Sequence, residues 1–403
     1  MGITRLPVTA ILGSSLFLIG MSAAAVAPYR AIVAIEHLGM TNALYALVMT
    51  LGSVGTAVAS LVLGYFSDRV PDRRQLIVGS ALLGVFAYGL VYFAPSQLSY
   101  ILAFCVILPF GGALFSQTFS FSRAFYNARQ PERAEFMMSA LRTLFAVSWV
   151  VVPPLAGFIA STYSVFDVFA AAALAHLGCT LMFGLLLTNP KAKIGPSPHG
   201  TTGRASGLSQ LPVSRRYGIG GVTLIRVAMA LHGTVLPLTL INEFGGTLTD
   251  VGINASLAAG LEVPFMLVWG WAAGRLRKEV ILTFNALIYA LYLLLVFFAG
   301  SVEHVLWLQG LNAVATAALL SITISYMQEA IAGQVGLSTS LMDVASVVAT
   351  FVAAALFAAL SSTFSYAAVF IAASLVSLAG AGMFGLSRMP RFQPRGPEQV
   401  RTD

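Results

Sequence analysis

Four ionisable residues lie deep within apolar stretches of this sequence: Arg142, Arg226, Glu262 and Asp343. An ionised side chain in hydrocarbon costs about 2.5–3.5 kcal/mol or more, so each of these residues needs a partner of opposite charge or a wet cavity. A carboxylate that loses its arginine partner takes up a proton more readily, because the charge that stabilised its ionised form is gone. Glu262 and Asp343 are therefore candidates for reversible proton binding within a membrane, with Arg142 and Arg226 as their partners.

Neutral polar side chains in neighbouring apolar stretches have the chemistry to bind hydroxyl groups. Amide groups donate and accept hydrogen bonds, and an aromatic ring offers an apolar face. For any one such residue, packing between helices is the commoner role, and His232 resembles a buried, hydrogen-bonded histidine more than a proton relay. The candidates for substrate contact are Gln117, His232, Asn254, Gln309 and Asn312, with Trp149, Trp307 or Tyr326 as the aromatic face.

The sequence has no Cys/His spacing typical of a metal site, no phosphate-binding loop and no arrangement typical of a catalytic nucleophile with its base. Its two cysteines, Cys105 and Cys179, lie in apolar runs and are interpreted as small packing residues. We therefore expect no metal, no cofactor and no enzymatic activity.

The composition indicates what surrounds these polar residues. Hydrophobic residues make up 58% of the chain and charged residues only 9%, against about 25% charged residues in soluble globular proteins. A helix that crosses a bilayer needs about 20 apolar residues, so a chain of 403 residues has room for about a dozen crossings. We expect an all-α membrane protein whose function is performed inside the bilayer.

Long apolar runs separated by short polar connections mark the individual helices. Residues 189–216, rich in Gly, Pro, Ser and basic residues, read as a flexible linker between two halves. The expected domains are a six-helix bundle (1–188), the linker (189–216), a second six-helix bundle (217–387) and a tail (388–403). The twelve expected spans are at about 8–31, 42–64, 75–94, 98–122, 135–160, 164–188, 217–241, 248–273, 280–300, 303–327, 336–360 and 364–387.

The net charge of +7 is explained by membrane topology. With these spans, all but three of the 22 Lys and Arg residues fall at one face of the membrane, and the exceptions are Arg30, Arg142 and Arg226. By the positive-inside rule that face is cytoplasmic, so both termini are cytoplasmic. Nucleic acid is excluded as a partner, and Arg30, near the outer end of the first span, is expected to snorkel.

The loop between the second and third spans packs charges between two apolar runs. An acidic side chain at a helix end can interact favourably with a helix N-terminus or an arginine, and arginines can donate hydrogen bonds to backbone carbonyls and lipid phosphates. We interpret this loop as a latch that clamps one helix end to another, with a simple topology anchor as the alternative. The latch residues are Gly64, Asp68, Arg69, Asp72, Arg73 and Arg74.

The two halves of the chain resemble each other in sequence. Residues 60–69 align with 266–275, and residues 116–121 align with 321–326, at a nearly constant offset of about 200 residues. Each match alone is weak, but their order supports an internal duplication. A duplicated bundle places a binding site between the halves near the membrane midplane, about which the halves can rock.

The latch loop resembles the major facilitator superfamily signature Gly-x-x-x-Asp-Arg-x-Gly-Arg-Arg. Gly64, Asp68 and Arg69 fit the signature, whereas Pro71 replaces its second glycine and an additional residue, Asp72, precedes the arginine pair. The resemblance implies two pseudo-symmetric bundles of six helices that work by alternating access.

Several segments are similar to the sugar efflux transporters of this superfamily. One of them, Ala-Gly-Leu-Glu-Val-Pro, contains the intramembrane acid Glu262. The chain departs from the family in its seventh span, where Thr239 stands in place of the tryptophan that the resemblance implies. The resemblance implies export of small sugars or glycosides from the bacterial cytoplasm, against an inward flow of protons. The similar segments are 67–77, 137–156, 259–264 and 308–314.

In the facilitator fold the fifth helix meets the eighth across the two halves, and the seventh neighbours the eleventh. The resemblance therefore implies two pairs, Arg142 with Glu262 and Arg226 with Asp343. Because the first pair bridges the halves, it could form in one state and break in another. We expect Glu262 or Asp343 to carry the exchanged proton, with Arg142 competing for the acid and contacting substrate; the alternative is a pair of static bridges.

Two other functions are consistent with these observations. The first is efflux of drugs or other small molecules by the same fold. The second is a membrane-embedded enzyme that handles lipids, which would need a catalytic cluster at the bilayer interface. If the protein is a sugar exporter, its expected partners are a sugar or glycoside, protons and the lipid bilayer. We expect it to be a monomer in the bacterial inner membrane.

Overall fold

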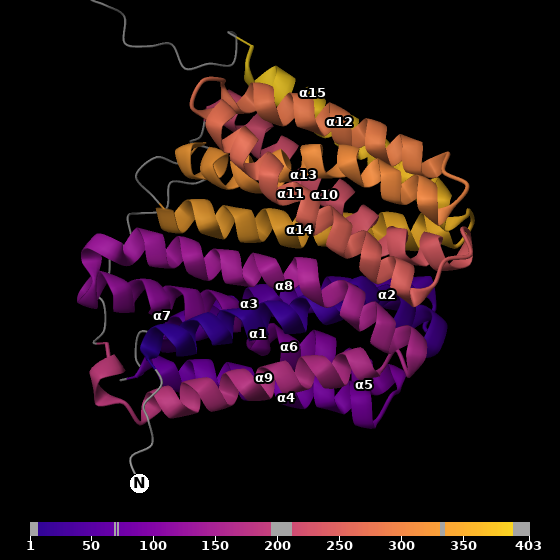
Figure 1. The fold of residues 1–403 in the computed structure, drawn as a ribbon. Helices are drawn as coiled ribbons and strands as arrows, with labels where there is room; N and C mark the ends of the chain where they lie inside the picture. Colours follow the sequence, from indigo (N-terminus) through magenta and orange to yellow (C-terminus); the bar gives the residue numbers. More distant parts are fainter. Residues whose placement is uncertain (1–6, 68–69, 71, 195–211, 331–334, 390–403) are drawn as a thin grey trace, which may run out of the picture.

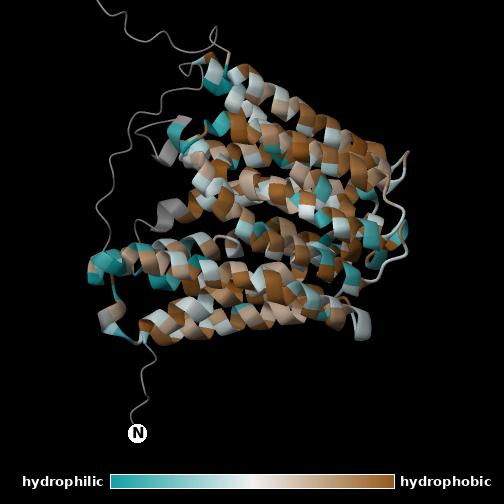
Figure 2. Ribbon diagram, turned by 45° about the horizontal axis from the view of Figure 1, so that its top comes forward, coloured by the Kyte–Doolittle hydropathy of each residue, from teal (hydrophilic) through white to brown (hydrophobic). Residues whose placement is uncertain are grey.

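The structure, a computed structural model, describes residues 7–67, 70, 72–194, 212–330 and 335–389, with the side chains of 64–67, 191, 330 and 335–340 excepted. Within these residues twelve segments are long and apolar enough to span a membrane, which confirms the spans expected from the sequence. Hydrophobic residues run along the helices, and hydrophilic residues are concentrated at their ends (Figure 2). The expected linker (189–216) and tail (388–403) lie largely outside the described residues.

The first six spans form one bundle, drawn from indigo to magenta in Figure 1. Two of these spans, the first and the fourth, consist of several helical segments each. In order the segments are α1 (Val8–Val26), η1 (Ala27–Tyr29), α2 (Arg30–Ile32), η2 (Val33–His37), α3 (Asn42–Ser67), α4 (Arg73–Phe93), α5 (Gln97–Ile101), η3 (Leu102–Ile107), α6 (Leu108–Gly111), α7 (Leu114–Arg129), η4 (Pro131–Arg133), α8 (Ala134–Thr162), α9 (Asp167–Leu187) and η5 (Pro190–Ala192).

The last six spans form the second bundle, drawn from rose to yellow. Each of these spans is a single helix. They are α10 (Val213–Asn242), α11 (Leu248–Ala273), α12 (Lys278–Phe297), α13 (Val302–Ala330), α14 (Val335–Ser361) and α15 (Tyr366–Ser387). The structure therefore has the two six-helix bundles that the sequence predicts, and the start of α1, the end of α9 and the start of α10 lie at the same end of the molecule (Figure 1). We call this the linker end.

Helix ends are specified by local side chains. The Ser96 side chain caps α5 in a reciprocal capping box with Ser99, and Thr247 does the same for α11 with Asp250. Gly39 is in the left-handed backbone conformation, with φ 66°, in the turn before α3. Because only glycine adopts this conformation without strain, the turn can be sharp.

The first span departs from a regular α-helix where it approaches the centre of the molecule. Pro28 cannot donate a backbone hydrogen bond, and the chain forms a 3₁₀ turn at η1, followed by the π-helical segment η2. The fourth span has a π-helical segment of its own, η3. Such irregular turns change which way side chains point, and they present Arg30 and Phe104 to a shared cavity.

The bundles contact each other mainly where α8 packs against α11 and where α3 packs against α14. The approach of α8 and α11 depends on glycine. A Cβ atom on Gly157 would lie 2.8 Å from the Leu248 carbonyl oxygen, and one on Gly252 would overlap the Pro153 carbonyl. The hydroxyl of Tyr29 donates to the Leu248 carbonyl at 3.1 Å, so a tyrosine of the first span seals this junction.

Side chains fasten the bundles together at the end opposite the linker. These bonds connect helix ends and turns, so they close that end of the interface between the bundles. They are Asn42 Nδ2 to the Ser361 carbonyl at 3.2 Å, Tyr366 Oη to Asn42 Oδ1 at 3.3 Å, Asn242 Nδ2 to Glu36 Oε1 at 3.0 Å, and Ser161 Oγ with Thr249 Oγ1 at 2.8 Å.

Candidate functional site

A cavity of about 670 Å³ lies at the interface of the two bundles. The first bundle contributes apolar side chains, among them Phe145 and Trp149 of α8. The second bundle contributes the polar ones. We call this cavity the amide pocket, and its polar lining consists of His232, Asn254, Glu262, Gln309, Asn312 and Thr316.

A continuous hydrogen-bond network orders the amides of this pocket. Asn312 Nδ2 donates to Gln309 Oε1 at 2.7 Å, and Gln309 Nε2 donates to Asn254 Oδ1 at 2.8 Å. All three amides are buried, and Asn254 and Gln309 hold the network through the bond between them. The buried Asn312 Oδ1 atom accepts no hydrogen bond from any described residue. Because an orphaned buried acceptor is costly, Asn312 is the amide best placed to receive a ligand hydroxyl.

Glu262 belongs to the same network. Its Oε1 atom accepts a hydrogen bond from Thr316 Oγ1 at 2.6 Å, and Thr316 in turn donates to the Asn312 carbonyl at 2.8 Å. The carboxylate is thus bonded to a residue one turn of α13 from Asn312, and it lines the same pocket as Trp149 of the first bundle. An acceptor, a carboxylate and an aromatic face thus surround one space, as sugar recognition requires.

His232 is held between two tyrosines of α12. Its Nδ1 and Nε2 atoms lie 3.0 Å from the hydroxyls of Tyr289 and Tyr292 respectively, and Gln309 Nε2 also donates to Tyr292 at 3.2 Å. This agrees with the interpretation of His232 as a buried, hydrogen-bonded histidine. The sequence reading missed both tyrosines; the signal was their spacing of three residues, which places both on one helix face.

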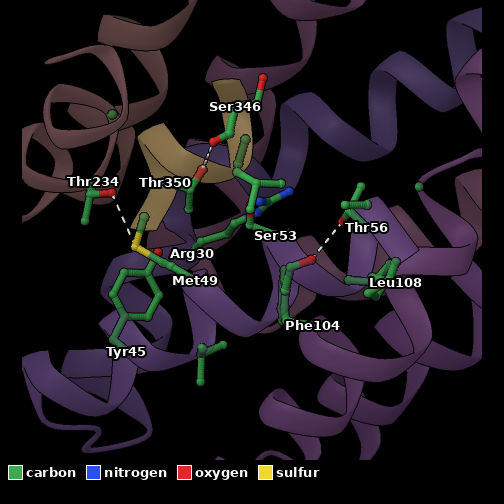
Figure 3. Close-up of a pocket in the computed structure, with 18 of the residues that line it drawn as sticks. Arg30, Tyr45, Met49, Ser53, Thr56, Phe104, Leu108, Thr234, Ser346 and Thr350 are labelled. Carbon is green, nitrogen blue, oxygen red and sulfur yellow. Dashed lines mark hydrogen bonds between the residues drawn. The ribbon is translucent and has the colours of Figure 1, made fainter. Parts of the chain in front are cut away.

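A second cavity, of about 540 Å³, adjoins the amide pocket where Ala27 and Gly233 line both. We call it the arginine pocket. Figure 3 shows its lining from both bundles, with the Arg30 guanidinium directed into the pocket and Ser346 and Thr350 of α14 among the opposing side chains. The expectation that Arg30 snorkels to the membrane surface is therefore wrong. The 3₁₀ turn at Pro28 rotates the helix so that the next residues face inward.

Asp343 lines the arginine pocket from α14. Arg226 of α10 lies close enough to interact electrostatically with Asp343, but among the described residues its hydrogen bond goes to Ser346 Oγ, at 2.8 Å. Ser346 is one turn from Asp343 on the same helix. The structure thus brings Arg226 and Asp343 together as neighbours, without a direct ion pair.

Arg142 and Glu262 are not paired in this structure, contrary to the expectation. The Arg142 guanidinium lies over the Phe119 ring, 4.9 Å from its centroid, within its own bundle. The helices α8 and α11 are antiparallel, with Gly252 opposite Pro153 and Leu248 opposite Gly157. The same pairing, continued along the two helices, places Arg142 level with Glu262. The two residues are therefore at the same height, although each contacts a residue of its own bundle.

Several other expected contacts lie elsewhere. Gln117 lines a separate pocket of about 260 Å³ within the first bundle and lies 3.5 Å from Ser80 Oγ. Trp307 is 78% exposed on the surface, and Tyr326 is buried against Phe384. Of the three expected aromatic faces, Trp149 alone lines the amide pocket. Because the spanning helices are apolar on every face, the sequence pattern does not indicate which aromatic side chain turns toward the cavity.

The latch loop is partly described. Asp72 caps α4 and forms an ion pair with Arg74 at 2.6 Å, and Arg74 Nη1 donates to the carbonyls of Leu186 at 2.6 Å and Asn189 at 2.9 Å. The hydrogen bonds that Arg74 donates to the Asp72 carboxylate hold the pKa of this carboxyl below its usual value. The start of α4 is thereby tied to the end of α9. Asp68 and Arg69 lie outside the described residues, as do the surroundings of Gly64, and Arg73 adjoins Asp72 at the start of α4.

Comparison with known proteins agrees with this architecture. The chain is 26% identical to a putative sugar efflux transporter of Deinococcus radiodurans, over 92% of this chain and 95% of the relative. It is 29% identical to sugar efflux transporter B of Salmonella typhimurium, over 83% and 84%. The expected resemblance to sugar efflux transporters is therefore confirmed.

Solved structures share the fold at low sequence identity. A crystal structure of the peptide transporter POT in complex with sulfate superposes with a TM-score of 0.78 at 13% identity, covering 97% of this chain and 96% of that one. A bacterial homologue of the iron transporter ferroportin, in an inward-facing state, gives 0.74 at 17% identity, over 96% and 100%. The family model of the Major Facilitator Superfamily matches residues 12–217 and 218–402. The chain therefore belongs to the major facilitator superfamily, and it is a membrane transporter rather than an enzyme.

Proposed function

We propose that this protein exports small sugars or glycosides from the bacterial cytoplasm in exchange for protons, by alternating access. The observation that carries the proposal is the amide pocket, in which the free Asn312 acceptor, the Glu262 carboxylate and Trp149 face one space between the bundles. The names of the sugar efflux relatives support the substrate class.

The pocket chemistry suits a sugar ring. Ring hydroxyls would donate to Asn312 and Glu262, while the apolar face of the ring would stack on Trp149. Asn254 and His232 would act by holding the network around the ring, since Asn254 Oδ1 and both ring nitrogens of His232 are already hydrogen-bonded. Gln117 has no place in this site, because it lies in a different pocket.

The arrangement also supports a direction of opening. The side with most Lys and Arg residues, which is the linker end, is cytoplasmic by the positive-inside rule. The bundles are fastened at the opposite, outer end. These bonds support an assignment of this conformation to the state that faces the cytoplasm, in which a substrate for export would load.

We infer that Glu262 is the proton carrier and Arg142 its state-dependent partner. When the linker ends of α8 and α11 close in the outward-facing state, Arg142 would reach Glu262 at the same height and bind its carboxylate. A proton arriving from outside would neutralise Glu262, release Arg142 and allow the cytoplasmic side to open again. The neighbouring Asp343 and Arg226 offer a second site for a proton within α10 and α14.

Transport by purified protein in proteoliposomes tests this proposal. We expect labelled glucose or lactose to exchange in counterflow, and export to accelerate under an inward proton gradient. E262Q should retain counterflow and lose the response to the gradient, because the amide keeps the hydrogen-bond geometry but cannot change charge. Exchange of hydrophobic cations in place of any sugar would contradict the proposal and support drug efflux, and an unchanged gradient response in both E262Q and D343N would contradict the coupling.

A further inference from the structure

Arg30 differs from Arg74 and Arg226 in its partners. Arg74 is bonded to a carboxylate and two carbonyls. Arg226 donates from Nη1 to Ser346, with Asp343 nearby, while its Nε has no hydrogen-bond partner among the described residues. The Arg30 guanidinium lies over the Phe104 ring, 5.3 Å from the centroid, and among the described residues it forms no hydrogen bond or ion pair. Arg30 is exposed, and it lines the arginine pocket.

The backbone holds this arginine firmly in place. The Tyr100 hydroxyl donates to the Arg30 carbonyl at 3.1 Å, and Tyr100 stacks on Phe104 with ring centroids 4.3 Å apart. Tyr100 of α5 thus holds the Arg30 backbone, and Phe104 of η3 lies under the guanidinium, which has five donor N–H groups and no hydrogen-bond acceptor among the described residues. A preorganised, unpaired cation in a membrane cavity is costly, and such residues mark ligand sites.

The charge around the arginine pocket favours a carboxylate as the missing partner. Asp343 also lines the pocket, but its near neighbour is Arg226. Two guanidinium groups therefore stand against one carboxylate, which leaves room for a single negative charge. A planar carboxylate matches the guanidinium with two parallel hydrogen bonds, whereas a doubly charged phosphate would face only one unpaired cation.

The arginine pocket and the amide pocket meet at Ala27 and Gly233. A Cβ atom on Gly233 would touch no other atom within 4 Å, so the passage between the pockets is open there. A ligand can therefore place a ring in the amide pocket and a substituent in the arginine pocket. Together the pockets are larger than a neutral monosaccharide requires.

We propose that Arg30 forms an anion subsite that makes this protein selective for acidic glycosides, with a sugar carboxylate bound at the guanidinium. This inference rests on the proposed sugar transport and specifies its substrate class. Neither the sequence resemblance nor the comparisons assign a role to Arg30. The aromatic ring of Phe104 below the guanidinium leaves its edge, which carries the donors, free for the carboxylate.

Two methyl glycosides that differ only at C6 provide the test. Inhibition of counterflow by methyl β-D-glucuronide is compared with inhibition by methyl β-D-glucoside, in proteoliposomes with wild-type protein. We expect the glucuronide to bind about tenfold more tightly, as for a hydrogen bond between charged groups. R30Q should reduce this preference to about one, and R30K should retain part of it, because lysine keeps the charge and loses the bidentate geometry.

Matched controls separate the subsite from the overall function. R275Q removes an arginine that stacks on the exposed Trp271, 3.8 Å from its centroid and outside both pockets, and should leave the preference unchanged. Equal inhibition by both glycosides in the wild type would overturn the subsite while sugar transport stands. Stronger inhibition by glucose 6-phosphate than by the glucuronide would overturn the assignment to a carboxylate. If no sugar inhibits or exchanges, the proposed function itself fails, and the subsite with it.

Discussion

At the scale of single residues, the site depends on which polar atoms are left without a partner. The amides of α11 and α13 bond one another until one acceptor, Asn312 Oδ1, is left. Hydrogen bonds between side chains make the network rigid, so it holds this acceptor in a fixed direction. We regard this preorganised acceptor, rather than the number of amides, as the basis of sugar recognition.

Asn312 and Gln117 provide a matched pair of substitutions. N312A should weaken sugar binding about tenfold, because it removes the free acceptor and loosens Gln309, whereas Q117A should leave it unchanged because Gln117 lies in another pocket. The measurement is the half-saturating sugar concentration in counterflow, with the melting temperature of each variant as a check on folding. A loss of affinity in Q117A equal to that in N312A would contradict the placement of the site.

At the scale of elements, the connections between helices determine how the bundles are held. The Asp72–Arg74 pair ties α4 to α9, and Arg74 is only 3% exposed. The contact between α8 and α11 depends instead on small residues that let two backbones meet. These two devices predict different consequences of substitution, one for stability and one for the equilibrium between states.

Removal of the latch carboxylate should destabilise the protein. D72A removes a helix cap and leaves the buried Arg74 without its carboxylate, so we expect a loss of about 2 kcal/mol at pH 7. The pKa of Asp72 is lowered in the folded protein, so its stabilising effect is present above its ordinary pKa and disappears as the pH falls through the lowered value. Unfolding of D72A and wild type by denaturant should therefore differ at pH 7 and converge as the pH falls through the lowered pKa of Asp72. A constant difference across this range would be evidence against the ion pair.

The glycine junction predicts a shift between conformational states. G252V places a side chain against the Pro153 carbonyl and the Tyr29 hydroxyl, so it should keep the outer end from closing. A cysteine introduced at Thr249 in a background without Cys105 and Cys179 should then react faster with a membrane-impermeant maleimide added outside. G270V is the control, because a Cβ atom there meets nothing within 4 Å. Equal labelling in the two variants would show that the junction does not gate the outer end.

At the scale of the whole molecule, transport requires the bundles to exchange contacts at one end for contacts at the other. The outer ends are bonded here, and the residues that would meet at the linker end, Arg142 and Glu262, each have a partner in their own bundle. An ion pair that forms in one state only can bias the equilibrium between states without fixing it.

A charge exchange between the bundles tests this pair. R142E and E262R should each reduce counterflow by about a hundredfold, because each leaves two like charges facing each other when the linker end closes. The double variant R142E/E262R should recover a large part of the exchange while it stays insensitive to the proton gradient. Absence of any recovery, with all three proteins folded by melting temperature, would exclude a direct contact.

The sequence by itself determined the membrane class, the twelve spans and the duplicated architecture. Each of these follows from a local property: a bilayer requires about 20 apolar residues per helix, and basic residues stay on one side of it. The acid Glu262 and the amide Asn312 could likewise be singled out, because a polar group in an apolar run is conspicuous wherever it points.

Only the tertiary structure decided which of these groups share a cavity. Spanning helices are apolar on every face, so their pattern does not tell which side turns toward the other bundle. Gln117 and Asn312 look alike in sequence, yet one lies in a separate pocket and the other in the amide pocket. In the sequence Arg30 looks like a residue at a helix end, yet in the structure it follows the 3₁₀ turn at Pro28 and lines the arginine pocket. The rotation of each helix is set by its packing against the other helices and not by its hydropathy.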